Sequence, residues 1–434
     1  MLEPLVYPSY DIIIIGAGIS GLYSAYKILK YHPTKKILIL EKNSKKHIGG
    51  RAGNYDFYNT SVVIGAGIGR LKKDKLLKKL LIEFDIPIKT YQTSHDYSKL
   101  INPPCKVKEI YMKIKHEFLK NPPQHQTFKK YAHTIIDNET YENFIICSGL
   151  SDYEEEDIYD TIYHYRMEDN YANFEMFSVP WSLLVQKLVD KVGIKNIKNN
   201  AEVIKIEKIG QTDNNKNYII SIKNPKTTDI SNIFNITTKK IIIATTIDSV
   251  LSLLPNNIYE NIHGQPFIRL YAKFSKSMTK ILNTYAHTTT MVKGPLQKVI
   301  PINIEKGVFM IAYSDNEHAL YLDKLVRYKK ENQENIKNNK EIREKLCILI
   351  EEGLGIPKNT LEMIAFKPFF WSIGTHYYGV LDSKKYINRE QYLELAQKPS
   401  KNIRIVGEMI SIDQGWTNGA LDSVDKVIIK KWLI

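Results

Sequence analysis

Short apolar runs alternate with amphipathic segments along this chain, beginning near its N-terminus. Ile12–Ile15 is apolar throughout, Leu22–Tyr31 has helical spacing with no breaker before Pro33, and Ile37–Leu40 is a second apolar run. Fully apolar runs of this length are typical of parallel strands that are buried on both faces of a sheet. We therefore predict a strand, a helix and a second parallel strand in this part of the chain.

Similar runs predict further strands, and two longer insertions separate them. The later predicted strands are residues 201–206, 239–243, 267–274, 298–302, 308–313 and 403–406. Residues 72–179 have mostly helical spacing, with breaks at the Pro-Pro pairs 103–104 and 122–123. Because strands and helices alternate, we predict an α/β fold, and a chain of 434 residues suits two domains.

The turn after the first apolar run carries the glycine spacing of a dinucleotide-binding site. Gly16 permits a tight turn, Gly18 lets the backbone approach a pyrophosphate, and Gly21 allows helix and strand to pack closely. The start of the helix offers N–H groups and a partial positive charge to the phosphates. Glu41, roughly twenty residues on, is placed to accept hydrogen bonds from a ribose. The sequence therefore predicts a Rossmann-type dinucleotide site.

The segment that follows indicates which dinucleotide is bound. Gly49-Gly50-Arg51 comes shortly after Glu41, and two glycines with an arginine suit close contact with phosphate oxygens. This segment resembles the flavin-containing amine oxidase family, in which the loop and its arginine cover the FAD pyrophosphate. An NAD-binding Rossmann domain does not need it. The resemblance implies FAD as the cofactor.

The C-terminal part of the chain resembles the same family independently. A short strand ends in Gly407-Glu408, and Gly415-Trp416-Thr417-Asn418-Gly419-Ala420-Leu421 precedes a helical stretch. In the family the glutamate binds the ribityl chain, and the helix points its N-terminus at the pyrimidine edge of the flavin. A reduced flavin carries negative charge there, which a helix N-terminus stabilises.

Weaker matches lie between these two motifs. Val203 lies in a segment like the one whose backbone touches the adenine in the family, Ala244 ends a strand that returns to the FAD, and Gly67 and Ile68 belong to a glycine-rich turn under the flavin ring. The resemblance therefore implies this set of cofactor-binding residues: Gly16, Gly18, Ile19, Ser20, Gly21, Glu41, Lys42, Gly49, Gly50, Arg51, Gly67, Ile68, Val203, Ala244, Trp371, Gly407, Glu408, Trp416, Thr417 and Ala420.

The resemblance also implies the residues at the reacting end of the site. In the family, aromatic side chains frame the substrate amine, and Trp416 occupies one wall position. The opposing wall matches the segment that begins at Trp371, in which His376 falls on the aromatic position and Tyr377 lies next to it. Arg269 stands where the family has a lysine that contacts flavin N5 through water. We expect Trp416, His376, Tyr377 and Arg269 to act in catalysis.

Departures from the family pattern limit what the resemblance implies. Relatives with covalently bound flavin have a cysteine where this chain has Thr375, so we expect FAD to be bound noncovalently. Arg269 keeps the charge of the family lysine but changes its geometry. Val179-Pro180-Trp181 replaces the glycine pair that precedes a helix in the family.

Three functions remain open at this point. The resemblance implies an FAD-dependent oxidase of an amine, which transfers a hydride from the carbon next to nitrogen to flavin N5 and is reoxidised by O2 to give H2O2. The first alternative is a related oxidase or desaturase that acts on a non-amine substrate. The second is a structural or interaction protein, associated with nucleic acid, that retains the FAD fold.

We expect a discontinuous FAD-binding domain and an interleaved substrate domain. The predicted FAD-binding domain comprises residues 1–71, 180–260 and 396–434. The predicted α+β substrate domain comprises residues 72–179 and 261–395, with a mixed sheet covered by helices.

Composition adds information on partners and location. The 61 basic and 47 acidic residues give a net charge of +14, which suits either a solvated surface or attraction to a nucleic acid or an acidic partner. The basic segments are 72–79 and 327–345. Cys105, Cys147 and Cys347 are widely separated and predict neither a disulfide framework nor a metal site, so we expect a reducing compartment such as the cytoplasm. We find no signal peptide and no apolar run long enough to span a membrane.

Overall fold

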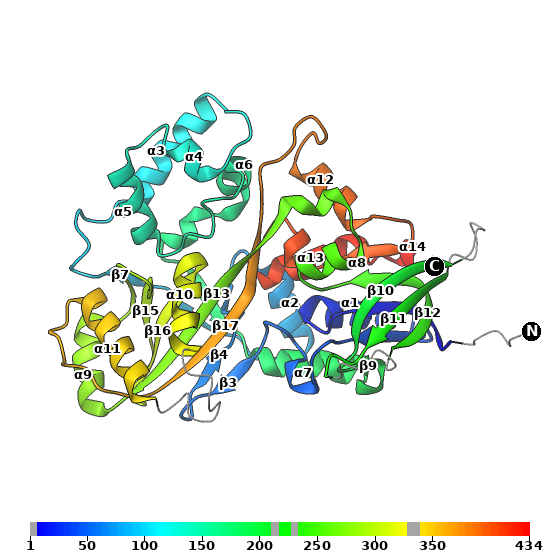
Figure 1. Ribbon diagram of the computed structural model, residues 1–434, viewed down its shortest axis with the longest axis horizontal. Coiled ribbons are helices and arrows are strands. Elements are labelled where there is room, and N and C mark those ends of the chain that lie inside the picture. Colours follow the sequence, from blue (N-terminus) through cyan, green and yellow to red (C-terminus); the bar gives the residue numbers. More distant parts are fainter. Residues whose placement is uncertain (1–6, 210–216, 227–232, 328–338) are drawn as a thin grey trace, which may run out of the picture.

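The computed structural model describes residues 7–209, 217–226, 233–327 and 339–434. The first apolar runs lie at the centre of a seven-stranded sheet (Figure 1). Its central strands are parallel, as predicted, and β1 pairs with β2 on one side and β12 on the other. The strands, in their order across the sheet, are β10 (Glu202–Ile209), β11 (Asn217–Lys223), β12 (Phe234–Ile243), β1 (Ser9–Ile15), β2 (Ile37–Leu40) and β9 (Ile197–Lys198), with β18 (Ile403–Ile405) also pairing with β12.

Alternate isoleucines of β1 enter two different hydrophobic cores. Ile12 and Ile14 pack into the core under one set of helices, and Ile13 and Ile15 pack into the core on the opposite face. The first core contains α1 (Ile19–Tyr31), α2 (Lys75–Glu83), α7 (Trp181–Val192), α13 (Thr417–Val427) and α14 (Lys430–Leu433), and the second contains α8 (Ile247–Leu253) and α12 (Arg389–Gln397). Burial on both faces explains why this strand is apolar at every position.

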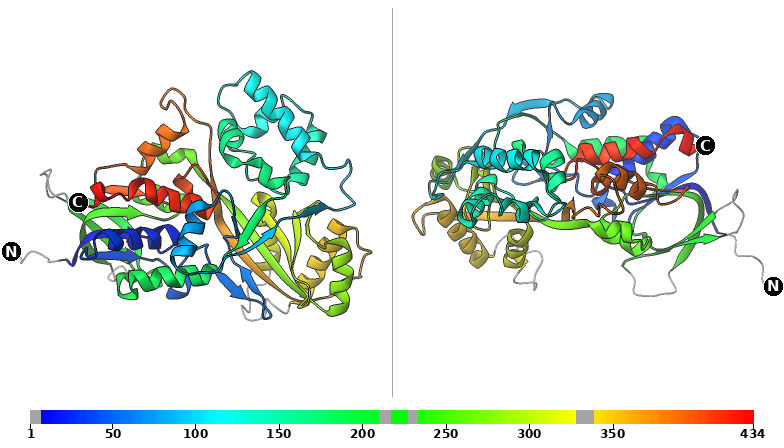
Figure 2. Two further views of the ribbon diagram at one scale, coloured as in Figure 1. Left: turned by 180° about the vertical axis from the view of Figure 1, so that it is seen from behind. Right: turned by 90° about the horizontal axis from the view of Figure 1, so that it is seen from above.

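A second sheet of six strands lies beside the first, and its outer face is covered by three helices (Figures 1 and 2). The covering helices are α9 (Lys276–Tyr285), α10 (Asn316–Arg327) and α11 (Lys340–Leu354). The strands, in their order across the sheet, are β17 (Met363–Tyr378), β13 (Ile262–Phe274), β16 (Val308–Asp315), β15 (Lys298–Asn303), β14 (Thr289–Met291) and β7 (His95–Tyr97). The predicted mixed sheet covered by helices is thus present.

The remaining elements form a helical group and two small sheets. The helices are α3 (Val107–Lys120), α4 (Phe128–Ala132), α5 (Asn138–Ser148) and α6 (Ile158–Asp160), which share a separate hydrophobic core (Figure 1). The small sheets are β3 (Asn54–Asp56) with β4 (Ser61–Val63), and β5 (Ile68–Arg70) with β8 (Glu175–Ser178) and β6 (Lys89–Gln92). Helices are the main regular elements of residues 72–179, as expected, but this segment also contributes β6, β7 and β8.

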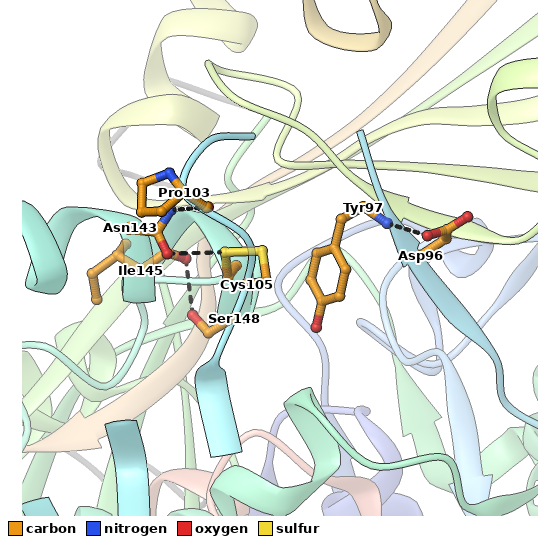
Figure 3. The surroundings of a disulfide bond; sticks show 8 residues. Asp96, Tyr97, Pro103, Cys105, Asn143, Ile145 and Ser148 are labelled. Carbon is orange, nitrogen blue, oxygen red and sulfur yellow. Dashed lines mark hydrogen bonds between the residues drawn. A yellow bond between two sulfur atoms is a disulfide. The ribbon is translucent and has the colours of Figure 1, made fainter. Parts of the chain in front are cut away.

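A disulfide between Cys105 and Cys147 corrects the expectation that these cysteines are unpaired. It joins the segment before α3 to the last turn of α5, with a Cα–Cα distance of 5.5 Å (Figure 3). Asn143 supports this junction, because its amide donates to the carbonyl oxygen of Pro103 at 3.0 Å. The two cysteines are 42 residues apart, so only the packing of the helices brings them together. The inference of a reducing compartment, which rested on unpaired cysteines, loses its basis.

The two predicted basic segments lie in different parts of the chain. Residues 72–79 include the start of the amphipathic helix α2, which buries Leu77 and Leu80. The second basic segment falls partly on residues 328–338, which lie outside the described residues.

The strands of the seven-stranded sheet all come from the three predicted FAD-binding segments, but the domain boundaries stay a prediction. No helix in the described ranges is long and apolar enough to cross a membrane.

Candidate FAD and substrate site

The glycine turn between β1 and α1 has the geometry that its sequence predicted. Gly16 has φ +101°, and a Cβ atom there would lie 2.5 Å from the carbonyl oxygen of Ala244. A Cβ atom on Gly21 would lie 2.0 Å from the carbonyl oxygen of Gly16, so this position requires glycine for packing. A Cβ atom on Gly18 would meet no atom within 4 Å. Gly18 thus leaves open space at the start of α1, where a phosphate group can approach the backbone.

The start of α1 is free to bind an anion. Its first turn contains no acidic residue, and no side chain caps it. The N–H groups of such a turn have no partner within the helix and carry a partial positive charge. Gly49 and Gly50 pass directly beside this turn, since the N–H of Gly49 donates to the carbonyl oxygen of Ala17 at 2.9 Å and Gly50 lies against Gly18. Together these loops form a backbone cradle suited to a pyrophosphate.

Glu41 follows β2 and connects the glycine turn to the next loop. Its side-chain oxygens accept hydrogen bonds from the N–H groups of Ala17 and Asn43, both at 2.9 Å. Glu41 is buried but lines the cavity described below. A carboxylate has about four acceptor positions. Two backbone bonds therefore orient the Glu41 carboxylate and leave acceptor capacity for ribose hydroxyls.

Glu408 lies at the centre of a charged cluster. Its Oε1 atom accepts hydrogen bonds from Nη1 of Arg51 at 2.7 Å and is 2.5 Å from Nδ1 of His376. Arg51 also donates to the carbonyl oxygen of Gly374 at 2.7 Å. Burial alone would raise the pKa of Glu408, but His376 and Arg51 outweigh it and lower this pKa to about 2. Glu408 is therefore a carboxylate at neutral pH, held between two basic side chains.

The position of His376 differs from the expected aromatic wall. Its ring is buried against Glu408, and Nε2 accepts a hydrogen bond from the N–H of Ile247 at 3.3 Å. Tyr377 packs against His263, with ring centres 5.1 Å apart. Neither residue lines the large cavity, whereas Thr375 does. The expected wall of His376 and Tyr377 is therefore corrected: His376 orients Glu408.

The alternation of side chains along β17 explains this shift. Thr375 pairs with Gln265 and Trp371 pairs with Phe267, so β17 takes four residue steps where β13 takes two. The two extra residues are an even number, so Trp371 and Thr375 stay on the same side of the strand and His376 lies on the other. Trp371 stays on the cavity side, and its indole N–H donates to the carbonyl oxygen of Ile64 at 2.7 Å.

Trp416 immediately precedes α13 and lies in the cavity wall. The guanidinium carbon of Arg70 lies 3.7 Å from its ring centre. Arg70 is fully buried and forms ion pairs with Asp74 at 2.6 Å, Asp169 at 3.2 Å and Asp413 at 2.9 Å. Trp416 is half-buried, with one face on this fixed cation. The first turn of α13 contains no acidic residue, so its N-terminus favours negative charge in the cavity.

Arg269 and Lys298 contact the ring of Tyr313. The guanidinium of Arg269 lies 4.0 Å from the ring centre, and the ammonium of Lys298 lies 5.3 Å from it. Nε of Arg269 also donates to the carbonyl oxygen of Gly65 at 2.8 Å. Burial lowers the pKa of Lys298 to about 8, against the opposing effect of nearby Asp152. Lys298 and Asp152 were not identified from the sequence, because nothing in their local sequence distinguishes them from surface residues.

One cavity of about 1620 Å³ connects these groups. Of the residues predicted to bind the cofactor, all except Gly21 line it. The lining includes Gly16, Gly18, Ile19, Ser20, Glu41, Lys42, Gly49, Gly50, Arg51, Gly67, Ile68, Val203, Ala244, Trp371, Gly407, Glu408, Trp416, Thr417 and Ala420, together with Asp152, Arg269, Lys298, Tyr313 and Thr375. The open space at Gly18, the uncapped start of α1 and the oriented Glu41 carboxylate fit a dinucleotide. No group of His, Cys, Asp and Glu side chains suited to a metal ion occurs among the described residues.

Comparisons with known proteins agree with this geometry. Residues 14–100 match the family described as NAD(P)-binding Rossmann-like domain. A double mutant of putrescine oxidase, made in a redesign of cofactor binding, superposes with a TM-score of 0.70 at 12% identity, covering 97% of this chain and 98% of that one. Cyclohexylamine oxidase from Brevibacterium oxydans superposes with a TM-score of 0.67 at 13% identity and the same coverage. The chain has the fold of the flavin amine oxidases.

The sequence comparison finds a viral relative. An uncharacterised protein of Acanthamoeba polyphaga mimivirus is 22% identical over 498 aligned positions, which cover 97% of this chain and 93% of that protein. The Rossmann-like family match and the structural likeness to putrescine oxidase confirm the fold class and the family resemblance that were predicted from the sequence. The nucleic-acid partner suggested by the net charge gains no support from these proteins.

Proposed function

We propose that this protein is an FAD-dependent oxidase of an amine that binds its flavin noncovalently. The observation that carries the proposal is the cavity itself, which brings together the start of α1, Glu41, Glu408 and Trp416. These groups come from both ends of the chain and are the ones that the family resemblance assigns to FAD. The structural likeness to two amine oxidases supports the same reading.

Different parts of the cavity would hold different parts of the cofactor. The cradle of Gly18 and Gly50 suits the pyrophosphate, and Glu41 suits the adenosine ribose. Glu408 faces the same cavity as a carboxylate and suits hydroxyl groups of the ribityl chain. The start of α13 would stabilise negative charge on the flavin ring. FAD held by these residues would supply the redox chemistry of an oxidase, namely hydride acceptance at N5 and reoxidation by O2 to give H2O2.

The cysteines support noncovalent binding. Thr375 lines the cavity where the covalent relatives have a cysteine. Cys105 and Cys147 are paired with each other, and Cys347, a residue of α11, is buried in the core of the six-stranded sheet. The cavity lining of the described residues therefore contains no cysteine that could attach to a flavin.

The charges near the reacting end favour a neutral amine. An amine gives up a hydride from its α-carbon only when its nitrogen lone pair is free, so the ammonium form must first lose a proton. Arg269 and Lys298 are buried cations in the cavity wall, and they disfavour a third positive charge nearby. Trp416 and Tyr313 offer aromatic surfaces that position the substrate and exclude water.

An anaerobic substrate panel tests the proposal. We expect purified protein reconstituted with FAD to lose its yellow colour with at least one amine from a panel of monoamines, polyamines and amino acids. Admission of air should restore the colour and release one H2O2 per oxidised amine. Bleaching by a non-amine alone would favour the alternative oxidase. Protein that fails to bind FAD, or that binds DNA in a salt-dependent manner without flavin reduction by any substrate, would overturn the proposal in favour of an interaction protein.

A further inference from the structure

A small polar pocket adjoins the large cavity behind Thr375. Its volume is about 30 Å³, which is enough for about two water molecules. Its lining is rich in ionisable groups: Asp152, Glu156, Asp160, His164, Tyr165, His376, Tyr377 and Tyr378. This pocket plays no part in holding the cofactor as described above.

Four side chains line both the small pocket and the large cavity, and so form the boundary between them. They are Asp152, Tyr165, Thr375 and Gln414. Oγ1 of Thr375 and Oε1 of Gln414 are buried, and neither has a hydrogen-bond partner in the described structure. Buried polar atoms without a protein partner are usually satisfied by ordered water. The boundary therefore indicates water that links the two spaces.

Asp152 is the carboxyl group of this boundary. Its carboxylate accepts a hydrogen bond from the hydroxyl of Tyr165 at 2.5 Å. Burial and then the negative charge of Asp315 raise the pKa of Asp152 to about 7, while the Tyr165 hydrogen bond and Lys298 oppose this rise. Asp152 can consequently both accept and release a proton near neutral pH.

The positive charge of Lys298 explains why a substrate ammonium would lose its proton in the cavity. Lys298 is 92% buried and lines the cavity, and its ammonium group lies 5.3 Å from the ring centre of Tyr313. We find no hydrogen bond or ion pair for its ammonium group within the described residues. An ammonium substrate beside this cation would be repelled, whereas a neutral amine would not. A proton leaving the substrate therefore needs an acceptor nearby, and Asp152 faces the same cavity.

His164 connects the small pocket to solvent. Its side chain is 27% exposed, and Nε2 lies 3.9 Å from the exposed carboxylate of Glu390. Burial lowers the pKa of His164, with Glu390 and Asp413 acting against this shift and Arg389 and Arg166 acting with it. His164 is thus a partly exposed imidazole at the outer end of the pocket, where it can pass protons to solvent.

The inner acids of the pocket are held in fixed positions. Arg389 donates to Oδ2 of Asp160 through Nε at 2.9 Å and Nη2 at 2.7 Å, and Thr161 donates to Glu156 at 2.8 Å. Burial raises the pKa of Asp160 to about 6 and the pKa of Glu156 above its ordinary range. Carboxyl groups with raised pKa values on both sides of a small pocket favour the passage of protons through its water.

We propose that Asp152 accepts the proton that the substrate ammonium loses, and that the small pocket conducts this proton to His164 and solvent. The inference rests on the proposed amine oxidase function. In the step, the substrate N–H bond breaks and an O–H bond forms on the Asp152 carboxylate. The products are a neutral amine and a neutral carboxylic acid, and no electron is transferred. Water in the small pocket then takes the proton to His164, which restores the Asp152 carboxylate.

The pH dependence of anaerobic flavin reduction in Asp152→Asn tests the first step. With an amine that bleaches the wild type, we expect reduction at pH 7 to slow by roughly 100-fold, as for loss of a general base. Reduction should recover as the pH approaches the pKa of the free amine, because solution then supplies neutral substrate. Asp152→Glu should restore much of the rate at pH 7. Glu155→Gln, which removes an exposed carboxylate of the same loop, should behave as the wild type.

A second measurement does not depend on catalysis. We expect the infrared spectrum of the cofactor-free wild type to contain a protonated-carboxyl band that titrates near pH 7 and is absent from folded Asp152→Asn. His164→Gln should keep this band but slow flavin reduction at pH 7. An unchanged band, or an unchanged pH profile in Asp152→Asn, would overturn the role of Asp152. A normal rate in His164→Gln would overturn the outlet. Failure of every amine to bleach the wild type would instead remove the proposed function on which the inference rests.

Discussion

The guanidinium of Arg70 lies 3.7 Å from the ring centre of Trp416, so a cation fixed by buried ion pairs supports one face of a cavity-lining aromatic side chain. Arg70 is held in place by ion pairs with three carboxylates, those of Asp74, Asp169 and Asp413. A cation over an aromatic ring stabilises it by about 0.5–2 kcal/mol. Trp416 is thus held in place where it lines the cavity.

Trp416→Ala should therefore impair catalysis more than stability. We expect the variant to retain FAD, because the glycine loops and Glu408 remain, while flavin reduction by an amine slows strongly through loss of orientation. Anaerobic reduction and a thermal melt should be measured on the same preparation, with Trp416→Phe as the control that keeps an aromatic surface. Early melting with loss of FAD would mean that Trp416 is mainly a core residue.

Two alanine substitutions in the glycine turn should affect different properties, FAD affinity in one case and stability in the other. Gly18→Ala should fold normally, since its φ is −70° and its Cβ meets no atom, but FAD affinity should fall at least about tenfold, or ~1.4 kcal/mol. Gly21→Ala should destabilise the fold, because its Cβ would lie 2.0 Å from a carbonyl oxygen. Flavin titration and thermal melts distinguish the two. Normal FAD affinity in Gly18→Ala would place the phosphates elsewhere.

The cluster of Glu408, His376 and Arg51 predicts a dependence of stability on pH. The folded pKa of Glu408, about 2, lies below the ordinary value of about 4.3. Its carboxylate therefore contributes about 3 kcal/mol of stability, which is fully present above pH 5 and is lost as the pH falls toward 2. In His376→Asn, the loss should begin at the same pH, which the unfolded-state pKa sets, but should end at a higher pH and be smaller in total. Urea unfolding at pH 7, 5 and 3 measures this, and identical profiles for variant and wild type would contradict it.

Glu41→Ala and Arg51→Ala should each weaken FAD binding by roughly 1–3 kcal/mol, the worth of a hydrogen bond to a charged group. Glu41→Ala also removes the acceptors of the Ala17 and Asn43 N–H groups, so part of its effect should appear in the melting temperature of the cofactor-free protein. Lys45→Ala, in the exposed segment between them, is the control. Denaturation should release all the flavin from wild type and variants alike. Colour that remains with the precipitated chain would show covalent attachment.

The disulfide should stabilise the helical group of α3 to α6. Closing a loop of this length lowers the entropy of the unfolded chain, which corresponds to about 2–4 kcal/mol. We expect reductant to lower the melting temperature of the wild type but not that of Cys105→Ser/Cys147→Ser. Thiol titration of the unfolded, unreduced wild type should find one free cysteine, Cys347. Three free thiols would show that the bond does not form.

The dinucleotide half of the site could be predicted because its determinants are local. Gly16, Gly21 and the apolar residues of β1 adopt conformations that short-range packing requires, so their spacing in the sequence carries the information. Glu408 and Trp416 were found through a second local motif. These residues converge on one cavity although they come from opposite ends of the chain.

The substrate half could not be predicted in the same way. Lys298 belongs to a strand like many others, and its position opposite Met291 of β14 and in the cavity lining is set by the pairing of distant segments. The wall positions were assigned by matching a family motif, whereas alternation along β17 from Trp371 places Thr375, rather than its neighbour His376, toward the cavity.

The pairing of β13 with β17 extends from Phe274 and Met363 at one end to Ile262 and Tyr378 at the other. The same two strands thus build the wall of the six-stranded sheet and reach the cluster around Glu408 (Figure 1). The pairing has register shifts at Gln265/Phe267 and at Lys273/Phe274, but it is hydrogen-bonded on both sides of the first shift, so two paired strands rather than a single flexible linker join the two sheets. We therefore expect the two sheets to move little relative to each other, and the range of substrates of the proposed oxidase to depend on the bulk of the cavity side chains.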